Sequence, residues 1–187
     1  MQRIFNISGL LLTALLLAAC NGSDGQVSQS APTSVLATTS LKTVSVAVAK
    51  DARVNKLPRL DNADTTQTAA QVLAHVNQTL KTELPQQFKG TSPVTVNVSI
   101  VSIDMSSGAG RALGSASFLT ANVVVVDTMS GKTIKSGLVH TEQKPFRATG
   151  NIGIIVMLAS NAGSTKAKRY EELAAEFKSD LTLWLNQ

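Results

Sequence analysis

The chain has 187 residues, of which 43% are hydrophobic and 4% aromatic, and its formal net charge is +5 at pH 7. This length suits one domain with a packed core. The single cysteine excludes an intramolecular disulfide, so the core must hold together by packing alone. Basic and acidic residues are mixed rather than clustered with aromatic residues, which argues against a nucleic-acid-binding protein.

The first residues have the parts of an export signal. Arg3 supplies positive charge, and the run from Gly9 to Ala19 is apolar apart from Thr13. This run is too short to span a bilayer, which takes about 20 apolar residues. Small residues then precede Cys20, as they do at a signal cleavage site. We therefore predict that residues 1–19 form a signal peptide.

The residues Leu17-Ala18-Ala19-Cys20 resemble the lipobox of bacterial lipoproteins. The resemblance implies that the Cys20 thiol is diacylated, that the signal is removed before it, and that the new amine also carries a fatty acid such as palmitate. Two or more chains give stable anchoring, because each buried methylene contributes about 0.8 kcal/mol. The alternative is an ordinary secreted protein with a free thiol.

The residue after the cysteine is Asn21 rather than Asp. In enterobacteria-like lipoproteins, Asp at this position favours retention in the inner membrane. The resemblance therefore implies attachment to the outer membrane, facing the periplasm. The inner membrane and exposure at the cell surface stay open as alternatives.

Residues 20–40 are rich in Ser, Thr, Gln, Gly and Ala, and we expect a lipidated cysteine followed by a flexible tether. Residues 41–187 are expected to form a single globular domain. It opens with an alternating pattern over Leu41–Lys50 that predicts a half-buried strand. We expect Asp51–Leu60 to be a basic loop, either solvated or in contact with an anionic ligand or envelope polymer.

A helix is predicted next, beginning near Asp64 as N-cap with Gln67 as its capping-box partner. Apolar residues then recur at spacings of three and four, which indicates one buried face. These residues are Ala69, Leu73, Val76, Leu80 and Leu84. Pro85 ends the pattern. His75 lies beside this stripe, and we interpret it as a surface or boundary residue rather than a ligand.

Two strands follow. Pro93–Met105 alternates, but its phase slips by one residue near Ile100-Val101, which predicts a β-bulge. The glycine-rich stretch Ser106–Gly114 is expected to be a loop. Ser115–Asp127 contains four successive valines, which suggests a central strand covered on both faces.

A hairpin turn is predicted at Asp127–Lys132, where Gly131 can take a positive φ. Thr133–His140 is expected to return as the partner strand. The chain closes with a helix that opens at Thr165 or Lys166 and has an apolar stripe. The stripe comprises Tyr170, Leu173, Ala174, Phe177, Leu181 and Trp184. We interpret its Tyr and Trp as core residues.

Between the last strand and the last helix, Asn151–Gly163 is strongly apolar, framed by glycines and without a clear period. It could be a buried strand, a short helix or a lid that packs into the domain. Exposed apolar patches also mark interaction sites. Our candidate partner contact therefore lies here, and its residues are Ile152, Ile154, Ile155, Met157 and Leu158.

We find no catalytic set and expect neither a cofactor nor a metal. Gly131-Lys132-Thr133 lacks the earlier glycine of a phosphate-binding loop, and Gly108-Ala109-Gly110 lacks the spacing of a dinucleotide fingerprint. Two isolated histidines, His75 and His140, give no zinc-site spacing. Asp104 and Asp127 end neighbouring strands and could approach each other, although aspartates at strand ends more often form turns.

The predicted order is β-α-β-β-β-α, and the expected fold class is α+β. We expect a mainly antiparallel sheet of about four strands with two helices packed on one face. The strand and turn over Val125–Gly131 fit a V-x-D-x-x-S/T-G pattern and look like those of envelope lipoproteins of unknown function. The layout is also similar to the small domains of curli-type secretion lipoproteins, penicillin-binding-protein activators and the N-terminal domain of TolB.

These features favour a lipid-anchored, non-enzymatic protein that binds another envelope component, protein or polymer, with no nucleic-acid partner. One alternative is a subunit of an oligomeric secretion or transport assembly. The other is a periplasmic ligand-binding or hydrolytic domain, which would need a pocket with converging polar groups.

Overall fold

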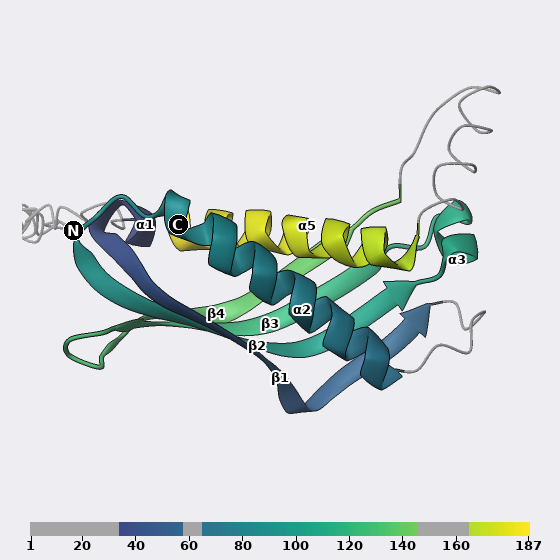
Figure 1. Ribbon diagram of the computed structural model, residues 1–187, viewed down its shortest axis with the longest axis horizontal. Helices are drawn as coiled ribbons and strands as arrows, with labels where there is room; N and C mark the ends of the chain where they lie inside the picture. Colours follow the sequence, from purple (N-terminus) through teal and green to yellow (C-terminus); the bar gives the residue numbers. More distant parts are fainter. Residues whose placement is uncertain (1–33, 58–64, 146–164) are drawn as a thin grey trace, which may run out of the picture. The chain divides into compact units, whose positions relative to one another are not determined.

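The structure is a computed structural model that describes residues 34–57, 65–145 and 165–187. All described residues belong to one compact unit, which spans Pro32–Gln187. The elements are α1 (Val35–Thr38), β1 (Thr39–Leu57), α2 (Thr65–Glu83), the 3-10 helix η1 (Leu84–Gln87), β2 (Ser92–Ser106), α3 (Gly108–Ala112), β3 (Ser117–Asp127), β4 (Thr133–Gln143) and α5 (Lys166–Asn186) (Figure 1).

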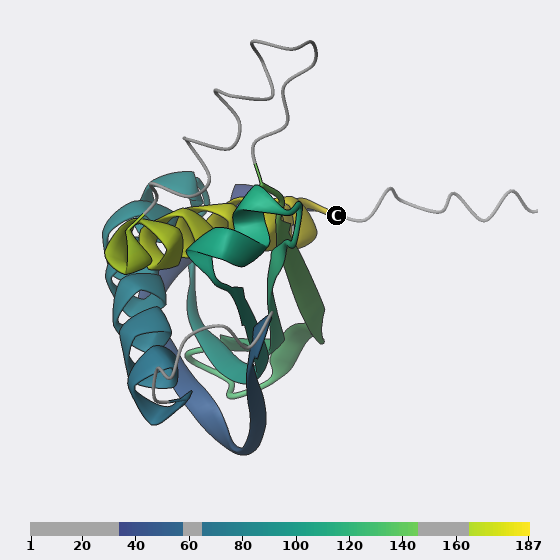
Figure 2. The same cartoon turned by 90° about the vertical axis from the view of Figure 1, so that its right-hand side faces the viewer.

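The four strands form one sheet in the order β1-β2-β3-β4. β1 and β2 are parallel, and the other two pairs are antiparallel. Parallel neighbours need a crossover, and α2 supplies it between β1 and β2. Both long helices lie on the same side of the sheet (Figure 2). The α+β fold and the mostly antiparallel sheet predicted from the sequence are confirmed.

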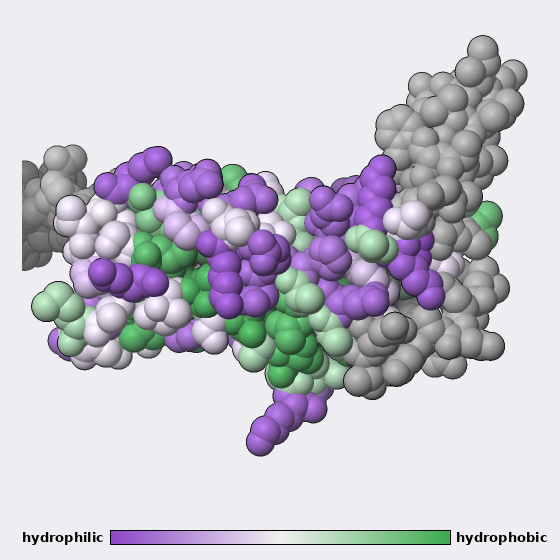
Figure 3. Space-filling view, in the orientation of Figure 1, coloured by the Kyte–Doolittle hydropathy of each residue, from purple (hydrophilic) through white to green (hydrophobic). Residues whose placement is uncertain are grey.

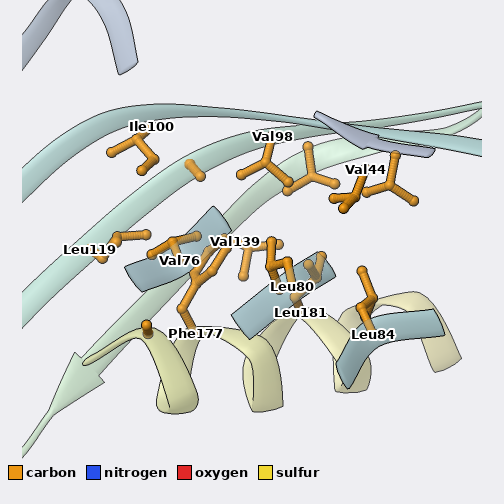
Figure 4. Packing of buried hydrophobic residues seen from close by; sticks show 14 of the residues in the cluster. Val44, Val76, Leu80, Leu84, Val98, Ile100, Leu119, Val139, Phe177 and Leu181 are labelled. Atoms are coloured by element: carbon orange, nitrogen blue, oxygen red, sulfur yellow. The ribbon is translucent and has the colours of Figure 1, made fainter. Parts of the chain in front are cut away.

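The core lies between the sheet and the two long helices (Figure 4). Valines and isoleucines on alternate positions of the inner strands face apolar side chains of α2 and α5. Fully buried members include Val96, Ile100, Leu119, Val123, Leu80 and Phe177. Burial of each such side chain contributes about 1.5–3 kcal/mol, so this layer is the main source of stability.

The two helices bury the faces that their sequence periods predict. In α2 the fully buried positions follow a spacing of four: Val72, Val76, Leu80 and, just beyond its end, Leu84. Ala69 and Leu73 of the predicted stripe are only partly buried. In α5 the predicted residues from Tyr170 to Leu181 are buried, whereas Trp184 is partly buried and Leu185 takes the fully buried position.

β1 is longer than predicted, and the loop expected from Asp51 onward is wrong as far as Leu57. Arg53–Leu57 pairs in register with Ser102–Ser106 of β2. The register of the ladder shifts between Leu41 and Thr43 and again between Val48 and Arg53, and β1 bends at the second shift (Figure 1). A hydrophobic area lies beside this bend in Figure 3, in contrast to the hydrophilic side chains along α5. The basic residues from Asp51 onward, predicted to form a loop, therefore belong to a strand as far as Leu57.

The β-bulge predicted in β2 is confirmed. Ile100 pairs with Ala121 and Ser102 pairs with Thr120, which leaves Val101 without a partner residue on β3. The loop predicted from Ser106 to Gly114 is wrong in part, because residues 108–112 form α3. The Ser107 hydroxyl accepts a hydrogen bond from the Gly110 amide at 2.9 Å, which caps this short helix.

β3 is an inner strand, but the prediction that both of its faces are covered is wrong. Val123 and Val125 are fully buried, whereas Val124 and Val126 are partly exposed. The cause is that both helices lie on one side of the sheet. The predicted turn after β3 is confirmed, with Gly131 at φ +69°.

α1 begins the folded part of the chain before Leu41. Val35 and Leu36 are buried in the core. The Ser34 hydroxyl donates to Oδ1 of Asn186 at 2.6 Å, which ties the first described residue to the end of α5. The amide of Lys89 also donates to the Leu36 carbonyl at 2.8 Å.

The domain therefore has two ends (Figure 1). The α1 end holds α1, the starts of β1 and β2, the β3–β4 turn and the end of α5. The α3 end holds α3, the ends of β1, β2 and β4, and the starts of α2 and α5. α2 and α5 run parallel, since His75 lies near Tyr170 and, further along both helices, Glu83 pairs with Lys178.

Within the described ranges, no helix combines the length and the apolar character that a membrane crossing requires.

Candidate functional site

A cleft of about 420 Å³ lies between the N-terminal halves of α2 and α5, at the α3 end. Its described lining comprises Thr68, Gln71, Ala74, His75, Lys166, Ala167 and Tyr170. His75 is half-buried, and its ring centre lies 6.3 Å from that of Tyr170, with the rings tilted by 36°. Such a concave site with several polar groups is where a ligand binds most readily.

The described lining of this cleft combines one cation with several side chains that can donate hydrogen bonds. Lys166 carries a cation, and the other polar members are a hydroxyl, an amide, an imidazole and a phenol, all of which can donate hydrogen bonds. The described lining residues include no aspartate or glutamate. The first turn of α5 also holds no acidic residue. The cleft is therefore suited to an acceptor-rich, anionic group.

A second polar cluster lies on the other side of α5, where α3 and the end of β4 meet it. Nη2 of Arg111 lies 3.3 Å from Oε2 of Glu172. The Gln143 amide donates to the same oxygen at 2.6 Å, and Lys168 Nζ lies 4.0 Å from Glu172 Oε1. One partly exposed carboxylate thus serves three side chains from three elements.

Arg111 is an unusual member of this cluster, because its side chain is only 7% exposed. Burial lowers the pKa of its guanidinium, Glu172 raises it, and the neighbouring charge of Arg169 lowers it further. Nε and Nη1 of Arg111 have no hydrogen-bond partner among the described residues, and neither does Oε1 of Gln143. The arginine is held mainly through Glu172, so that carboxylate is its critical partner.

The sequence did not single out Arg111, Gln143 or Glu172 as a cluster. They come from three elements, α3, β4 and α5, and even Gln143 and Glu172 are 29 residues apart in the chain. Only the packing of α3 and β4 against α5 joins them. The available signal was a lone arginine inside the glycine-rich stretch Ser106–Gly114, which the sequence predicts to be a loop. His75 was correctly placed at the boundary of the helix stripe, but its position in the cleft was not foreseen.

The other sequence-derived candidates are separate from the cleft. His140 is exposed on β4, where Nδ1 lies 2.9 Å from the Thr120 hydroxyl and the ring stacks on Phe118. Asp104 and Asp127 do not approach each other, because they lie at opposite ends of the antiparallel β2–β3 pair. Each accepts other hydrogen bonds instead: Asp104 from Asn55 on the neighbouring strand β1, and Asp127 from its own turn.

Cys20 lies outside the described residues, and so do Ile152, Ile154, Ile155, Met157 and Leu158. Their predicted roles as lipidation site and partner contact stay predictions. In the part of the chain that the structure describes, no three His, Cys, Asp or Glu side chains come together as a metal site would require.

No protein-family model matches the sequence, and no curated protein matches it either. Solved structures with a similar layout do exist. A protein of Xanthomonas campestris has 10% identity and a TM-score of 0.40, over 83% of this chain and 87% of that one.

Two further solved structures come from proteins described as lipoproteins. The one from Caulobacter crescentus has 12% identity and a TM-score of 0.28, over 64% of this chain and 83% of its own. The one from Neisseria meningitidis has 15% identity and a TM-score of 0.23, over 63% of this chain and 96% of its own. At these values the likenesses support no conclusion about function.

Proposed function

We propose that this chain is a lipid-anchored, non-enzymatic protein of the bacterial cell envelope that binds another envelope component. Its anchor is the acylated Cys20, and its location is the outer membrane, facing the periplasm. The proposal combines the lipobox of the sequence with the two-ended layout of the domain.

The observation that carries the proposal is the placement of these features at opposite ends. The first described residue, Ser34, lies at the α1 end, beside the end of α5. The apolar segment, Asn151–Gly163, lies in the sequence between Pro145 and Thr165. Pro145 follows β4 and Thr165 precedes α5, and both elements have these ends at the α3 end. The cleft and the Arg111 cluster lie there too. A domain held by its α1 end would present its α3 end to a partner.

The anchor is tested by labelling cells with palmitate. We expect the wild-type chain to incorporate label and to fractionate with membranes, whereas Cys20→Ala should do neither. Equal labelling of both forms would contradict the lipoprotein part of the proposal, while leaving the binding part open to its own test.

The contact is tested by crosslinking in cells, with mass spectrometry of the captured partner. The double substitution Ile155→Ser and Met157→Ser should weaken capture. Leu138→Ser is the matched control, since Leu138 is 62% exposed on β4, outside this segment, and its loss should leave capture unchanged. Unfolding of the double variant would show that the segment belongs to the core and would contradict the contact.

The cleft favours a second candidate function, that of a periplasmic ligand-binding domain. It supplies the pocket with converging polar groups that this alternative requires.

The alternative of an oligomeric assembly is tested by light scattering on the purified protein. A monomer at all concentrations would contradict it.

A further inference from the structure

We infer that the cleft between α2 and α5 is a binding site for a small molecule carrying a single anionic group, a carboxylate or a phosphate. The inference deepens the second candidate function, ligand binding in the cleft, and rests on it. It depends neither on the lipid anchor nor on a partner at the apolar segment Asn151–Gly163.

The first step is the balance of charge and hydrogen-bonding groups. The described lining has one full positive charge, on Lys166, and no carboxylate to neutralise it. Apart from Thr68, which already has a partner, its other polar groups are the hydroxyl of Tyr170, the amide of Gln71 and the imidazole of His75. Each of these can donate a hydrogen bond, and charge-assisted hydrogen bonds to an anion are the strong ones.

The second step is the field of the two helices. α2 and α5 run parallel, so both N-terminal halves border the cleft. Thr68 is in the first turn of α2, and Lys166 and Ala167 begin α5. Because the N-terminal end of a helix carries partial positive charge, which fades beyond the first turn, both helices favour an anion at the part of the cleft near Thr68 and Lys166.

The third step is size and shape. A volume of about 420 Å³ lies within the range of small-molecule pockets. Polar and apolar surfaces contribute about equally to the lining, and the apolar part comes from Ala74, Ala167 and the rings of His75 and Tyr170. The volume suits a compact molecule that combines an anionic group with a small apolar part, rather than a long acyl chain. Lys166 is exposed, so its ammonium can reach a ligand without a change of fold.

The test uses the purified full chain in detergent micelles, whether or not Cys20 carries lipid, studied by isothermal titration calorimetry. Glycerol 3-phosphate probes for a phosphate and N-acetylalanine for a carboxylate. Glycerol and N-acetylalanine amide are the uncharged controls. We expect at least one anionic probe to bind at a single site and both uncharged controls to fail. Whichever probe binds identifies the source of the anionic group. Binding of neither would overturn the inference.

Matched variants locate the binding site. Lys166→Gln should weaken binding by about tenfold, as expected for the loss of one charge-assisted hydrogen bond. Lys168→Gln removes the same charge from the same turn of α5, but Lys168 does not line the cleft, so its effect should stay below about twofold. Equal weakening by both variants would show a diffuse field rather than a site and would overturn the inference.

A second pair of variants tests the cleft from α2. Gln71→Glu introduces a carboxylate into the lining and should abolish binding by repulsion. Gln78→Glu places the same charge two turns along the helix, at an exposed position outside the lining, and should leave binding within about twofold. Unchanged binding by Gln71→Glu would place any bound anion elsewhere and contradict the inference.

Discussion

The two ends of the domain differ in how the polar groups at the ends of helices and strands are paired. At the α1 end, backbone groups are paired closely: the amide of Lys89 bonds to Leu36, that of Gly90 bonds to Thr39, and Asp127 caps its turn. At the α3 end, a buried arginine depends on one carboxylate and a polar cleft separates two helices. The comparison teaches that backbone groups are paired locally at the α1 end, whereas polar side chains from several elements meet at the α3 end.

The core that joins the two ends should show the largest effect. Phe177 is fully buried between α5 and the sheet. Phe177→Ala leaves a cavity and should lower the free energy of unfolding by about 3–5 kcal/mol. Leu183→Ala on the same helix is the control, because Leu183 is 61% exposed, and should cost less than about 0.5 kcal/mol. Urea denaturation measures both, and equal losses would contradict the assignment of the core.

The α1 end should be the less tolerant of the two to a single added methyl group. A Cβ on Gly90 would lie 1.9 Å from the carbonyl carbon of Thr38, far inside van der Waals contact. Because that contact is with backbone, Gly90→Ala must push the start of β1 away. We expect a loss of about 3 kcal/mol in the free energy of unfolding. Gly114→Ala is not a suitable control, since Gly114 has φ +90°.

A suitable control for Gly90→Ala is Thr91→Ala, at the next position, which is exposed. It should change the free energy of unfolding by less than about 0.5 kcal/mol. A similar small effect for Gly90→Ala would show that α1 does not pack closely against this loop.

The α3 end should respond to loss of its shared carboxylate. Glu172→Gln leaves the buried guanidinium of Arg111 without its ion pair, at a cost of about 1–2 kcal/mol. This cost is lower than that of breaking a fully buried ion pair, because the Glu172 side chain is 35% exposed. Glu171→Gln is the control: Glu171 is exposed next to it and should cost almost nothing. Thermal unfolding of both variants decides whether Glu172 holds the cluster.

The smallest effect concerns the turn at the α1 end and depends on pH. Hydrogen bonds from the Ser130 amide and hydroxyl, and from the Met129 amide, lower the pKa of Asp127 below its ordinary value. A carboxyl with a depressed folded-state pKa stabilises the fold above the unfolded-state pKa, which is about 4, and this stabilisation is lost as the pH falls through the folded-state pKa.

Asp127→Asn keeps an acceptor oxygen but cannot titrate. The difference in stability between wild type and this variant should therefore be constant above about pH 5 and shrink as the pH falls below about 4. Urea denaturation of wild type and Asp127→Asn, in steps of about one pH unit between pH 2 and pH 7, measures this difference. A difference that grew on acidification would contradict the cap.

Much of the fold could be predicted from local pattern. The alternation of valines in β2, the bulge at Val101 and the apolar stripe of α5 are short-range signals, and each was found where it was expected. The extension of β1 to Leu57 could not be predicted in this way. Its last residues are polar and basic, and only pairing with Ser102–Ser106 makes them a strand.

The candidate site could be predicted from the sequence to a smaller extent than the fold. His75 and Tyr170 were both identified from helix periodicity, one as a boundary and the other as a core residue. That they face each other across a cleft depends on the parallel packing of α2 and α5. The same holds for Arg111 and Glu172, which meet only because α3 lies against the first turns of α5.

By itself the sequence determined the lipobox prediction, the order of the elements, and which faces of the helices and strands are apolar. These properties follow from residue type and from periods of two and 3.6, which act over a few residues. The tertiary structure decided which pair of strands is parallel, that both long helices lie on one face of the sheet, and that the polar groups of two helices meet in a cleft. These features arise from contacts between distant residues, which no local pattern encodes.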